Sequence, residues 1–425
     1  MDSTGNISWA LTATALVLLM TPGVAFFYGG LVRAKSVISM MMMSFGAMGL
    51  IGVLWVLYGY AIAFPATDAG VTQMPWAIDP SNFGLTAALE TPEGSAYPPL
   101  AFVAFQATFA IITVALVSGA IADRAKFGSW MIFAAIWATV VYFPVASWVF
   151  NFGLAEDGSF SYGGWITHGL QDVFGVGAID FAGGTAVHIN AGAAALALAL
   201  VLGKRVGFQK GAHVPHNPPF VLLGAGLLWF GWFGFNAGSE LAADGTAALA
   251  FVNTIAAPAA ALLSWLIVEK IKDGKPTSVG AASGAVAGLV AITPACAALT
   301  PFWAIVLGLL AGAVCALAIE LKFKLGFDDS LDVVGIHLVG GLLGTLYIGF
   351  FATGTGLINS GSFNQLIVQA IAAFAVLIYS FVLAFIIGFA IEKTIGFRVK
   401  NEDEIAGIDT VVHGEEGYVL SDARA

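Results

Sequence analysis

Long apolar stretches alternate with short polar ones along the whole chain. An α-helix needs about 20 apolar residues to cross a hydrocarbon layer roughly 30 Å thick. The pattern therefore predicts an all-α integral membrane protein with eleven transmembrane helices. The expected spans are residues 8–31, 37–64, 100–122, 128–150, 181–202, 219–238, 246–268, 278–298, 302–321, 333–351 and 365–391.

The positive charges agree with this number of spans. All sixteen Lys and Arg residues follow an odd-numbered span or lie at or beyond the end of the last one. Cytoplasmic loops of membrane proteins carry the excess of Lys and Arg. We therefore expect a multi-pass protein of the cell (inner) membrane, with the N-terminus outside and the C-terminus in the cytoplasm.

The expected outer loops contain acidic residues but no Lys or Arg. An acidic outer face concentrates cations, although the same pattern arises when positive charge is simply excluded from outer loops. The acids are Asp68, Asp79, Glu90, Glu93, Glu156, Asp157, Asp172, Glu240 and Asp244.

Composition excludes several classes of protein. Hydrophobic residues make up 59% of the chain and charged residues 10%, whereas soluble domains have about 25% charged residues. The net charge of −10 and the lack of basic clusters argue against nucleic acid as a partner. No H-E-x-x-H motif occurs, and Cys296 and Cys315 stand apart from any His. We expect no metal and no cofactor, and an intramembrane enzyme using Asp and His is a disfavoured alternative.

Few ionisable residues fall inside the expected spans, and two of them are histidines. His188 lies early in span five and His337 early in span ten. An ionisable group in a membrane helix is costly unless it faces a partner or a cavity. Two neutral imidazoles, each able to donate and accept a hydrogen bond, suit a path for polar, proton-sharing solutes. The alternative is a pair of packing hydrogen bonds.

Asp180 precedes His188 by eight residues, or about 12 Å along a continuous helix. This spacing places the carboxylate at the outer end of span five. It predicts either a group that holds a cation or a cap for the start of the helix.

Aromatic residues form a second candidate site. Phe105 and Phe109 are one turn apart in span three, as are Phe235 and Ser239 at the end of span six. Because the two spans run in opposite directions, Phe105 and Ser239 should lie at the outer mouth, with Phe109 and Phe235 one turn deeper. Such rings can close a pore and attract a cation by about 0.5–2 kcal/mol each. Ordinary core or lipid-facing aromatics are the alternative, since the chain has 33 Phe.

These residues lie in motifs that together resemble the ammonium transporters of the Amt/Mep/Rh family, of the bacterial Amt type, nearly from end to end. The motifs are PGVAFFYGGLVR at 22–33, AFQATFA at 104–110, DFAGGTAVHIN at 180–190, GWFGFNAGS at 231–239, TPAC at 293–296 and DVVGIH at 332–337.

The resemblance implies transport of ammonium or ammonia across the lipid bilayer by a homotrimer with one pore in each subunit. It also implies an inverted five-helix repeat, for which the early histidines of spans five and ten are a hint in the sequence itself. By residue match, the outer ammonium site comprises Phe105 and Ser239, the gate Phe109 and Phe235, and the pore His188 and His337, with Asp180 as the essential aspartate.

Two points do not fit this picture simply. The family usually has a Trp at the outer site where this chain has Phe150, a weaker cation–π partner, and Trp148 could replace it only if the backbone shifts. Counted along ideal helices, His188 is about 12 Å from the outer end and His337 about 7 Å from the inner end. They should not meet unless a helix is interrupted or starts deeper than expected.

The chain divides into a transporter domain, residues 1–394, and a cytoplasmic tail, residues 395–425. The tail resembles the family's regulatory C-terminus, which implies a PII-type nitrogen regulator as a partner at the cytoplasmic mouth. A solvated acidic tail is the alternative. An ammonium sensor on the same fold, with little or no transport, is the alternative function.

Overall fold

The structure is a computed structural model that describes residues 3–65, 75–91, 97–154, 160–209 and 214–418. Several residues used above lie outside this part of the chain, namely the acids Asp68, Glu93, Glu156 and Asp157 and the basic residues Lys210 and Arg424.

Most helical residues in the first half of the chain belong to five long apolar segments. Its helices are α1 (Ser3–Leu31), α2 (Val37–Leu54), α3 (Tyr60–Ala63), α4 (Pro99–Val117), α5 (Phe127–Trp137), α6 (Phe143–Phe150), α7 (Leu170–Phe174) and α8 (Asn190–Leu202). Three π-helical turns, which are wider than α-helical ones, interrupt or begin these helices. The turn η2 (Trp55–Gly59) joins α2 to α3, η6 (Ala138–Tyr142) joins α5 to α6, and η8 (Gly184–Ile189) precedes α8.

The second half repeats this helical character. Its helices are α9 (Pro218–Gly238), α10 (Gly245–Lys272), α11 (Ser278–Ile292), α12 (Pro301–Ala318), α13 (Leu321–Leu325), α14 (Val339–Phe351), α15 (Leu357–Ser360), α16 (Asn364–Thr394) and α17 (Asn401–Ala406). The π-helical turn η9 (Val334–Leu338) starts α14. Short turns and one antiparallel hairpin complete the described chain: η1 (Ala34–Ser36), η3 (Pro80–Leu85), η4 (Ala87–Leu89), η5 (Ser118–Ile121), η7 (Trp165–Gly169), η10 (Asp409–His413), β1 (Phe152–Leu154) and β2 (Phe160–Tyr162).

Within the described residues, ten helical segments are long and apolar enough to cross a membrane. They confirm a multi-pass helical membrane architecture. The expected span at 278–298 differs, because α11 has only 15 residues and is followed by turns. Pro294 explains the early end, since a proline has no N–H to continue the helical hydrogen bonds.

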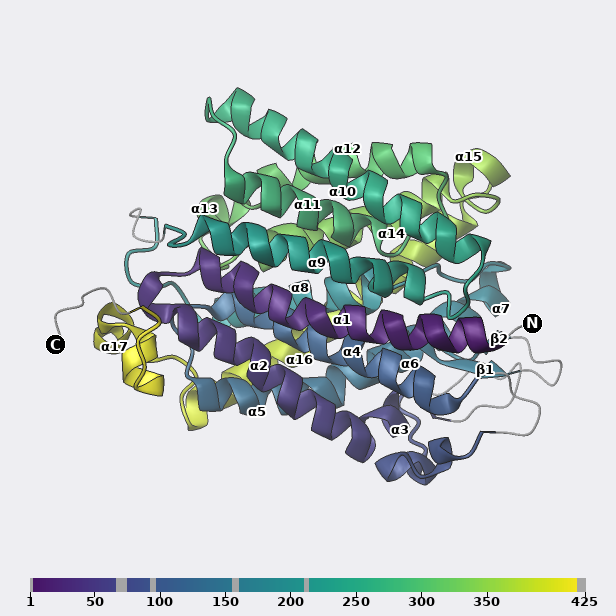
Figure 1. Cartoon of the computed structure of the whole chain (residues 1–425), viewed down its shortest axis with the longest axis horizontal. Helices are drawn as coiled ribbons and strands as arrows, with labels where there is room; N and C mark the ends of the chain where they lie inside the picture. Colours follow the sequence, from purple (N-terminus) through teal and green to yellow (C-terminus); the bar gives the residue numbers. More distant parts are fainter. Residues whose placement is uncertain (1–2, 66–74, 92–96, 155–159, 210–213, 419–425) are drawn as a thin grey trace.

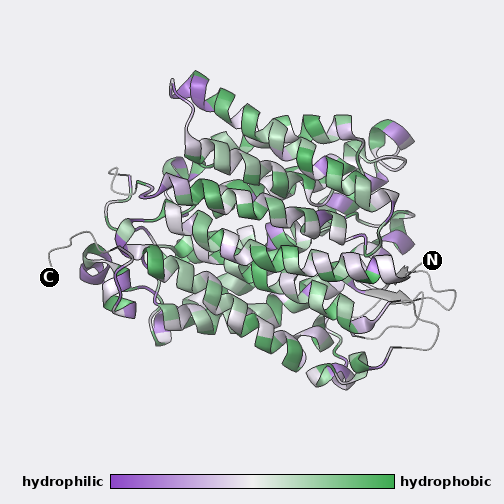
Figure 2. Cartoon of the chain, viewed as in Figure 1, coloured by the Kyte–Doolittle hydropathy of each residue, from purple (hydrophilic) through white to green (hydrophobic). Residues whose placement is uncertain are grey.

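The long helices lie side by side and point roughly along one direction, with α1 packed against α9 (Figure 1). Hydrophobic residues follow the middle of the helices, and hydrophilic ones concentrate mainly at the two ends (Figure 2). The C-terminal tail with α17 lies at one end, and the start of α1 lies at the other (Figure 1). The start of α1 and the described end of the tail are thus at opposite ends of the bundle.

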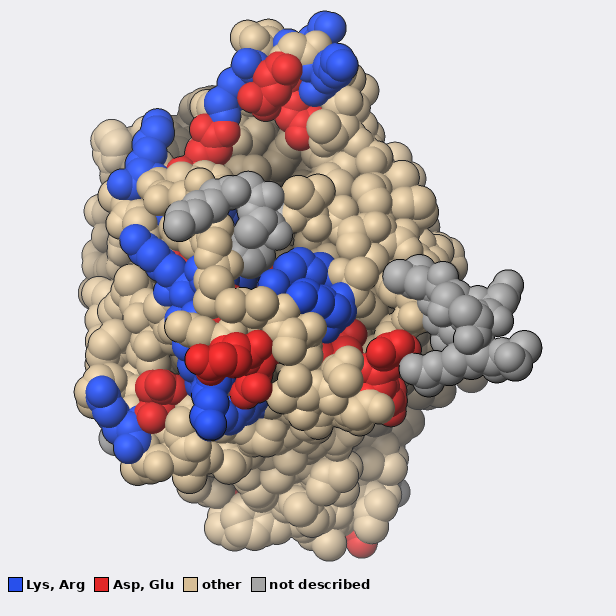
Figure 3. Space-filling view, turned by 90° about the vertical axis from the view of Figure 1, so that its left-hand side faces the viewer, with Lys and Arg blue, Asp and Glu red and all other residues tan. Residues whose placement is uncertain are grey.

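Charged side chains gather on the end of the bundle that carries α13 and α17 (Figure 3). Contacts join the predicted basic loops there: Arg33 Nη2 donates to the carbonyl oxygen of Glu404 at 3.0 Å, and Arg398 Nη1 to that of Leu202 at 3.0 Å. The loops that follow α1 and α8 therefore meet the tail at a single end of the bundle.

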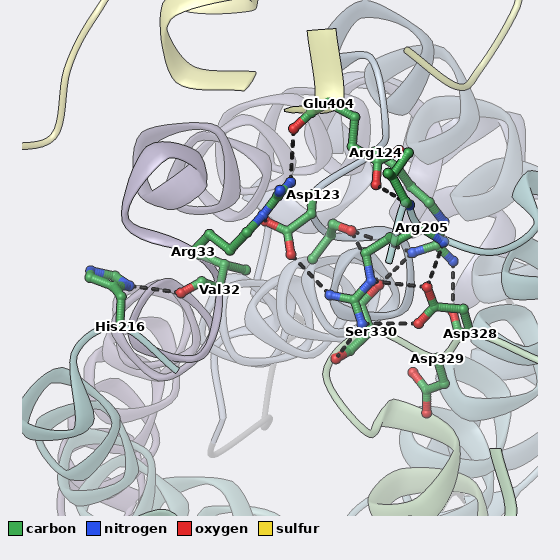
Figure 4. Close-up of polar contacts among 12 residues, drawn as sticks. Val32, Arg33, Asp123, Arg124, Arg205, His216, Asp328, Asp329, Ser330 and Glu404 are labelled. Carbon is green, nitrogen blue, oxygen red and sulfur yellow. Dashed lines mark hydrogen bonds and ion pairs between the residues drawn. The ribbon is translucent and has the colours of Figure 1, made fainter. Parts of the chain in front are cut away.

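A buried ion network lies beneath this charged end (Figure 4). Arg205 donates to Asp123 Oδ2 from Nη1 at 2.9 Å, and to Asp328 Oδ1 from Nη2 at 2.9 Å. Arg124 Nη2 donates to the carbonyl oxygen of Asp328 at 2.6 Å. Burial would raise the pKa of Asp123, but the guanidinium groups of Arg205 and Arg33 hold it below its ordinary range. The network ties together the loops after α1, α4, α8 and α13.

The described part of the tail packs onto the bundle. Glu404 is buried and accepts hydrogen bonds from the Val206 backbone N–H at 2.7 Å and from Arg398 at 2.8 Å. Asp409 accepts from the backbone N–H groups of Ile38 at 3.0 Å and Ser39 at 2.7 Å, at the start of α2. Up to residue 418 the tail is therefore an ordered part of the fold rather than a solvated extension.

Replacing Arg205 should destabilise the fold strongly. In Arg205→Met, Asp123 and Asp328 remain buried without their shared cation, and breaking a buried ion pair costs about 3–5 kcal/mol. The free energy of unfolding, measured by SDS titration of the purified protein in mixed micelles, should fall by that amount. The control is Lys272→Met, which removes an ion pair with Glu320 that is more than a third exposed and should cost about 1 kcal/mol or less. Equal losses in the two variants would contradict a special role for the network.

Candidate functional site

The two histidines meet in the interior. His188 lies in η8 and His337 in η9, with their Nδ1 atoms 3.1 Å apart and their rings nearly parallel at 21°. Their side chains are 1% and 3% exposed. Because one hydrogen lies between the two Nδ1 atoms, one ring donates and the other accepts. In the neutral pair, the donor ring has an accepting Nε2 and the other ring a donating Nε2–H.

Each histidine helix begins on a buried aspartate. Asp180 accepts hydrogen bonds from the backbone N–H groups of Gly183, Thr185 and Ala186 at 2.9–3.0 Å. Asp329, also buried, accepts from the backbone N–H groups of Val333 at 3.1 Å and Val334 at 2.7 Å. These carboxylates satisfy N–H groups that a helix start leaves without intrahelical partners. For Asp180, the structure thus supplies the capping contacts expected from sequence.

The aspartate caps also explain why the histidines meet. The expectation that they lie at different depths assumed helices starting at the surface, and it is wrong. The chain before each helix is already inside the protein: Phe181 N–H donates to the carbonyl oxygen of Pro294 at 3.2 Å, and Ser330 N–H to that of Ala120 at 3.3 Å. Both helices therefore start deep in the bundle, and the first turn of each carries its histidine.

The structure brings the predicted phenylalanines together. Phe109 and Phe235 stack with ring centroids 4.2 Å apart at 13°, and Phe105 lies 4.9 Å from Phe109. Phe235 is 6.1 Å from the His188 ring. The Ser239 hydroxyl donates to the carbonyl oxygen of Phe235 at 2.8 Å, so its oxygen lone pairs stay available to accept. A series of side chains thus runs from Ser239 to the histidine pair.

Phe150 and Trp148 separate into different clusters. The Phe150 ring lies edge-on to Phe109 at 6.1 Å. Trp148 packs 4.6 Å from Tyr379 and 5.6 Å from Trp165, and its indole N–H donates to the carbonyl oxygen of Pro75 at 2.6 Å. Phe150 therefore joins the phenylalanine cluster, whereas the position of Trp148 gives no support to its assignment as an ammonium ligand.

Two residues of the site were missed from sequence. Trp232 stacks on His188 at 5.4 Å and 18°, and its indole N–H donates to the Thr293 hydroxyl at 2.8 Å. Its signal was its place in the motif at 231–239, three residues before Phe235. The other is Asp329, whose signal was its spacing of eight residues before His337, the same as from Asp180 to His188.

The space beside the histidines is narrow and largely apolar. Its volume is about 10 Å³, near the lower limit for holding one water molecule. A cavity of about 570 Å³ opens separately among residues of the charged end, including Arg205, Lys322 and Asp332. The narrow space admits a small neutral molecule at much lower cost than an ion, because burying an unpaired charge costs many kcal/mol. Its lining includes Val24, Tyr28, His188, Trp232, Phe235 and His337.

Long apolar helices around a narrow, largely apolar space that contains two buried histidines are typical of a membrane transport protein. The profile of the Ammonium Transporter Family matches residues 8–418, and the chain belongs to this family.

Relatives and solved structures agree with this membership. The chain is 54% identical to the ammonium transporter of Mycobacterium tuberculosis, over 97% of this chain and 90% of that one. It is 40% identical to ammonium transporter Amt1 of Archaeoglobus fulgidus, over 98% of this chain and all of that one. The structure of Saccharomyces cerevisiae Mep2 superposes with a TM-score of 0.82, at 32% identity over 99% of this chain and 92% of that one. A sensor Amt protein gives 0.85 at 29% identity, over 96% and 98%.

The geometry predicts opposite tautomers for the two histidines. For the two Nδ1 atoms to share a hydrogen bond at 3.1 Å, one ring of the neutral pair must carry its proton on Nδ1 and the other on Nε2. Solid-state ¹⁵N NMR of histidine-labelled protein in lipid should show one signal set of each type for this pair, and His337→Ala should remove the coupling between them. Two Nε2-protonated rings would contradict the contact.

Proposed function

We propose that the chain transports ammonium across the membrane by recruiting NH₄⁺ outside and conducting NH₃ past His188 and His337. The contact between two buried imidazoles, directly behind stacked phenylalanine rings, carries this proposal. It places hydrogen-bonding groups where the surrounding wall is apolar.

Recruitment uses Phe105, Phe150 and Ser239 at the outer mouth. The two rings attract a cation through their faces, at about 0.5–2 kcal/mol each, and the Ser239 oxygen accepts one hydrogen bond from it. Asp180 adds its negative charge nearby while it caps η8. The contact of Phe105 and Phe150 with the Phe109 ring supports a single aromatic site.

Deprotonation occurs at the gate formed by Phe109 and Phe235. A whole cation in the apolar stretch would cost many kcal/mol, whereas ammonia needs only hydrogen-bond partners. The histidine pair offers one accepting and one donating Nε2, which match the N–H groups and the lone pair of ammonia. The proton either returns outside or crosses separately along the imidazoles.

The proposed assembly is a homotrimer of eleven-span subunits, each with its own pore, in the cell (inner) membrane. The N-terminus is outside, and the tail is cytoplasmic. An inverted five-helix repeat is supported by the matching aspartate, π-helical turn and histidine at η8 and η9. A PII-type regulator at the charged end, beside the ordered tail, is the proposed partner.

Removing His188 should slow transport. In His188→Ala, ammonia loses one hydrogen-bond partner in the narrow space, and an unsatisfied buried group costs about 1–3 kcal/mol, or about 5- to 160-fold in rate. Methylammonium uptake into proteoliposomes measures this, with His168→Ala, outside the narrow space, as the control. Unchanged rate and ion selectivity in His188→Ala would refute the pore assignment.

Ammonium binding by the wild type without uptake would favour a sensor, and currents on supported membranes would show whether charge crosses.

Phe150 and Trp148 should differ in their effect on ammonium affinity. Phe150→Ala removes a cation–π partner worth about 0.5–2 kcal/mol and should raise the apparent KM about 2- to 30-fold. Trp148→Phe should leave KM unchanged, because its ring packs against Tyr379 instead. Uptake is measured over a range of ammonium concentrations on variants that elute as the wild type in size-exclusion chromatography. A larger rise in KM for Trp148→Phe than for Phe150→Ala would instead assign the outer site to Trp148.

A further inference from the structure

One buried amide on α16 contacts both histidine-bearing parts of the chain. Gln369 is 0% exposed. Its Oε1 accepts from the Ile179 backbone N–H at 2.6 Å, and its Nε2 donates to the Ile179 carbonyl oxygen at 2.8 Å. The same Nε2 donates to the carbonyl oxygen of Thr345 at 3.1 Å. Oε1 also accepts from Gln365 Nε2 at 3.1 Å, so all hydrogen-bonding positions of the Gln369 side chain are used.

The partners of Gln369 belong to the two chain segments that carry the histidines. Ile179 directly precedes Asp180, the carboxylate that caps the helix of His188. Thr345 is on α14, eight residues after His337. A single side chain from a third helix therefore contacts the backbone of both segments that carry the histidines.

Ordinary packing does not account for this glutamine. Ile179 lies in a partly buried, irregular segment between α7 and η8, where no helix turn supplies partners for its N–H and carbonyl groups, and the Gln369 side chain that pairs with them is fully buried. A buried peptide group without a partner is costly. The glutamine amide has the same donor and acceptor arrangement as a peptide, so it pairs with Ile179 as a neighbouring strand would. Leucine or methionine would fill the volume but leave these groups unpaired.

We propose that Gln369 is a positioning residue for transport: by fixing Ile179 and Thr345, it sets Asp180 on the start of η8 and keeps His188 against His337. The inference rests on the proposed role of the histidine pair. Gln369 lies behind the site, not in the pathway, and acts only through these backbone contacts.

Gln365 provides a matched control on the same helix. It is one turn earlier, is also buried, and donates to the carbonyl oxygen of Gly177 at 3.1 Å and to Gln369. Gln365→Met removes a buried amide of the same size but leaves both hydrogen bonds between Gln369 and Ile179 in place.

The experiment compares Gln369→Met with Gln365→Met in full-length protein in lipid. Hydrogen exchange, followed by mass spectrometry, reports on residues 179–190, which include the amides held by Asp180. Exchange there should rise in Gln369→Met and stay at the wild-type rate in Gln365→Met. Methylammonium uptake should fall about tenfold or more in Vmax, because small displacements of aligned groups are costly. KM should not change, since the outer site is separate.

Each outcome decides the proposal. Unchanged exchange at residues 179–190, or unchanged Vmax, in folded Gln369→Met overturns it. If Gln369→Met does not fold, Gln369→Glu takes its place, because it keeps the acceptor for Ile179 N–H and loses both donations. Failure of both to fold, while Gln365→Met folds, assigns Gln369 to folding alone and also overturns the proposal. Normal uptake by His188→Ala refutes the proposed function, but the exchange result still tests the positioning separately.

Discussion

The structure depends on one constraint: a backbone N–H or carbonyl group inside a membrane protein must find its partner within the protein, because lipid offers none. A helix that crosses the whole bilayer meets this condition by itself. A helix that starts in the interior does not, and η8 and η9 both start there. Asp180 and Asp329 supply the missing acceptors for the first N–H groups. These caps support the starts of the two segments whose histidines contact each other.

The same constraint shapes the charged end. Arg205, Asp123 and Asp328 are buried where several loops converge, and each charge has an opposite partner. The tail contributes in the same way, since Asp409 accepts from the first N–H groups of α2, whose own flanking Ser36 side chain provides no cap. Segments far apart in sequence thus complete one another's hydrogen bonds, which ties the tail to the helix that follows α1.

The sequence predicted the features that depend on local pattern, such as helices and the spacing of their side chains. It failed where contacts with distant backbone groups determine where a helix starts or what a side chain does. Hydropathy located the helices, and helical spacing correctly brought the rings of Phe105, Phe109 and Phe235 into one cluster. The length of α11 was overestimated because Pro294 looked compatible with an apolar run. The depth of His337 was wrong because a buried loop before η9 looks like any other loop. Gln369 gave no signal of its own, since its role follows from Ile179, 190 residues away.

The contact between Phe109 and Phe235 has a consequence for the energy of the cell. A continuous file of water through a membrane protein would relay protons and dissipate the membrane potential, which stores about 2.3 kcal/mol per charge for each 100 mV. Rings stacked 4.2 Å apart leave no room for water between them. In the transport route proposed above, the stacked pair therefore interrupts such a file, so the route does not dissipate the membrane potential through water.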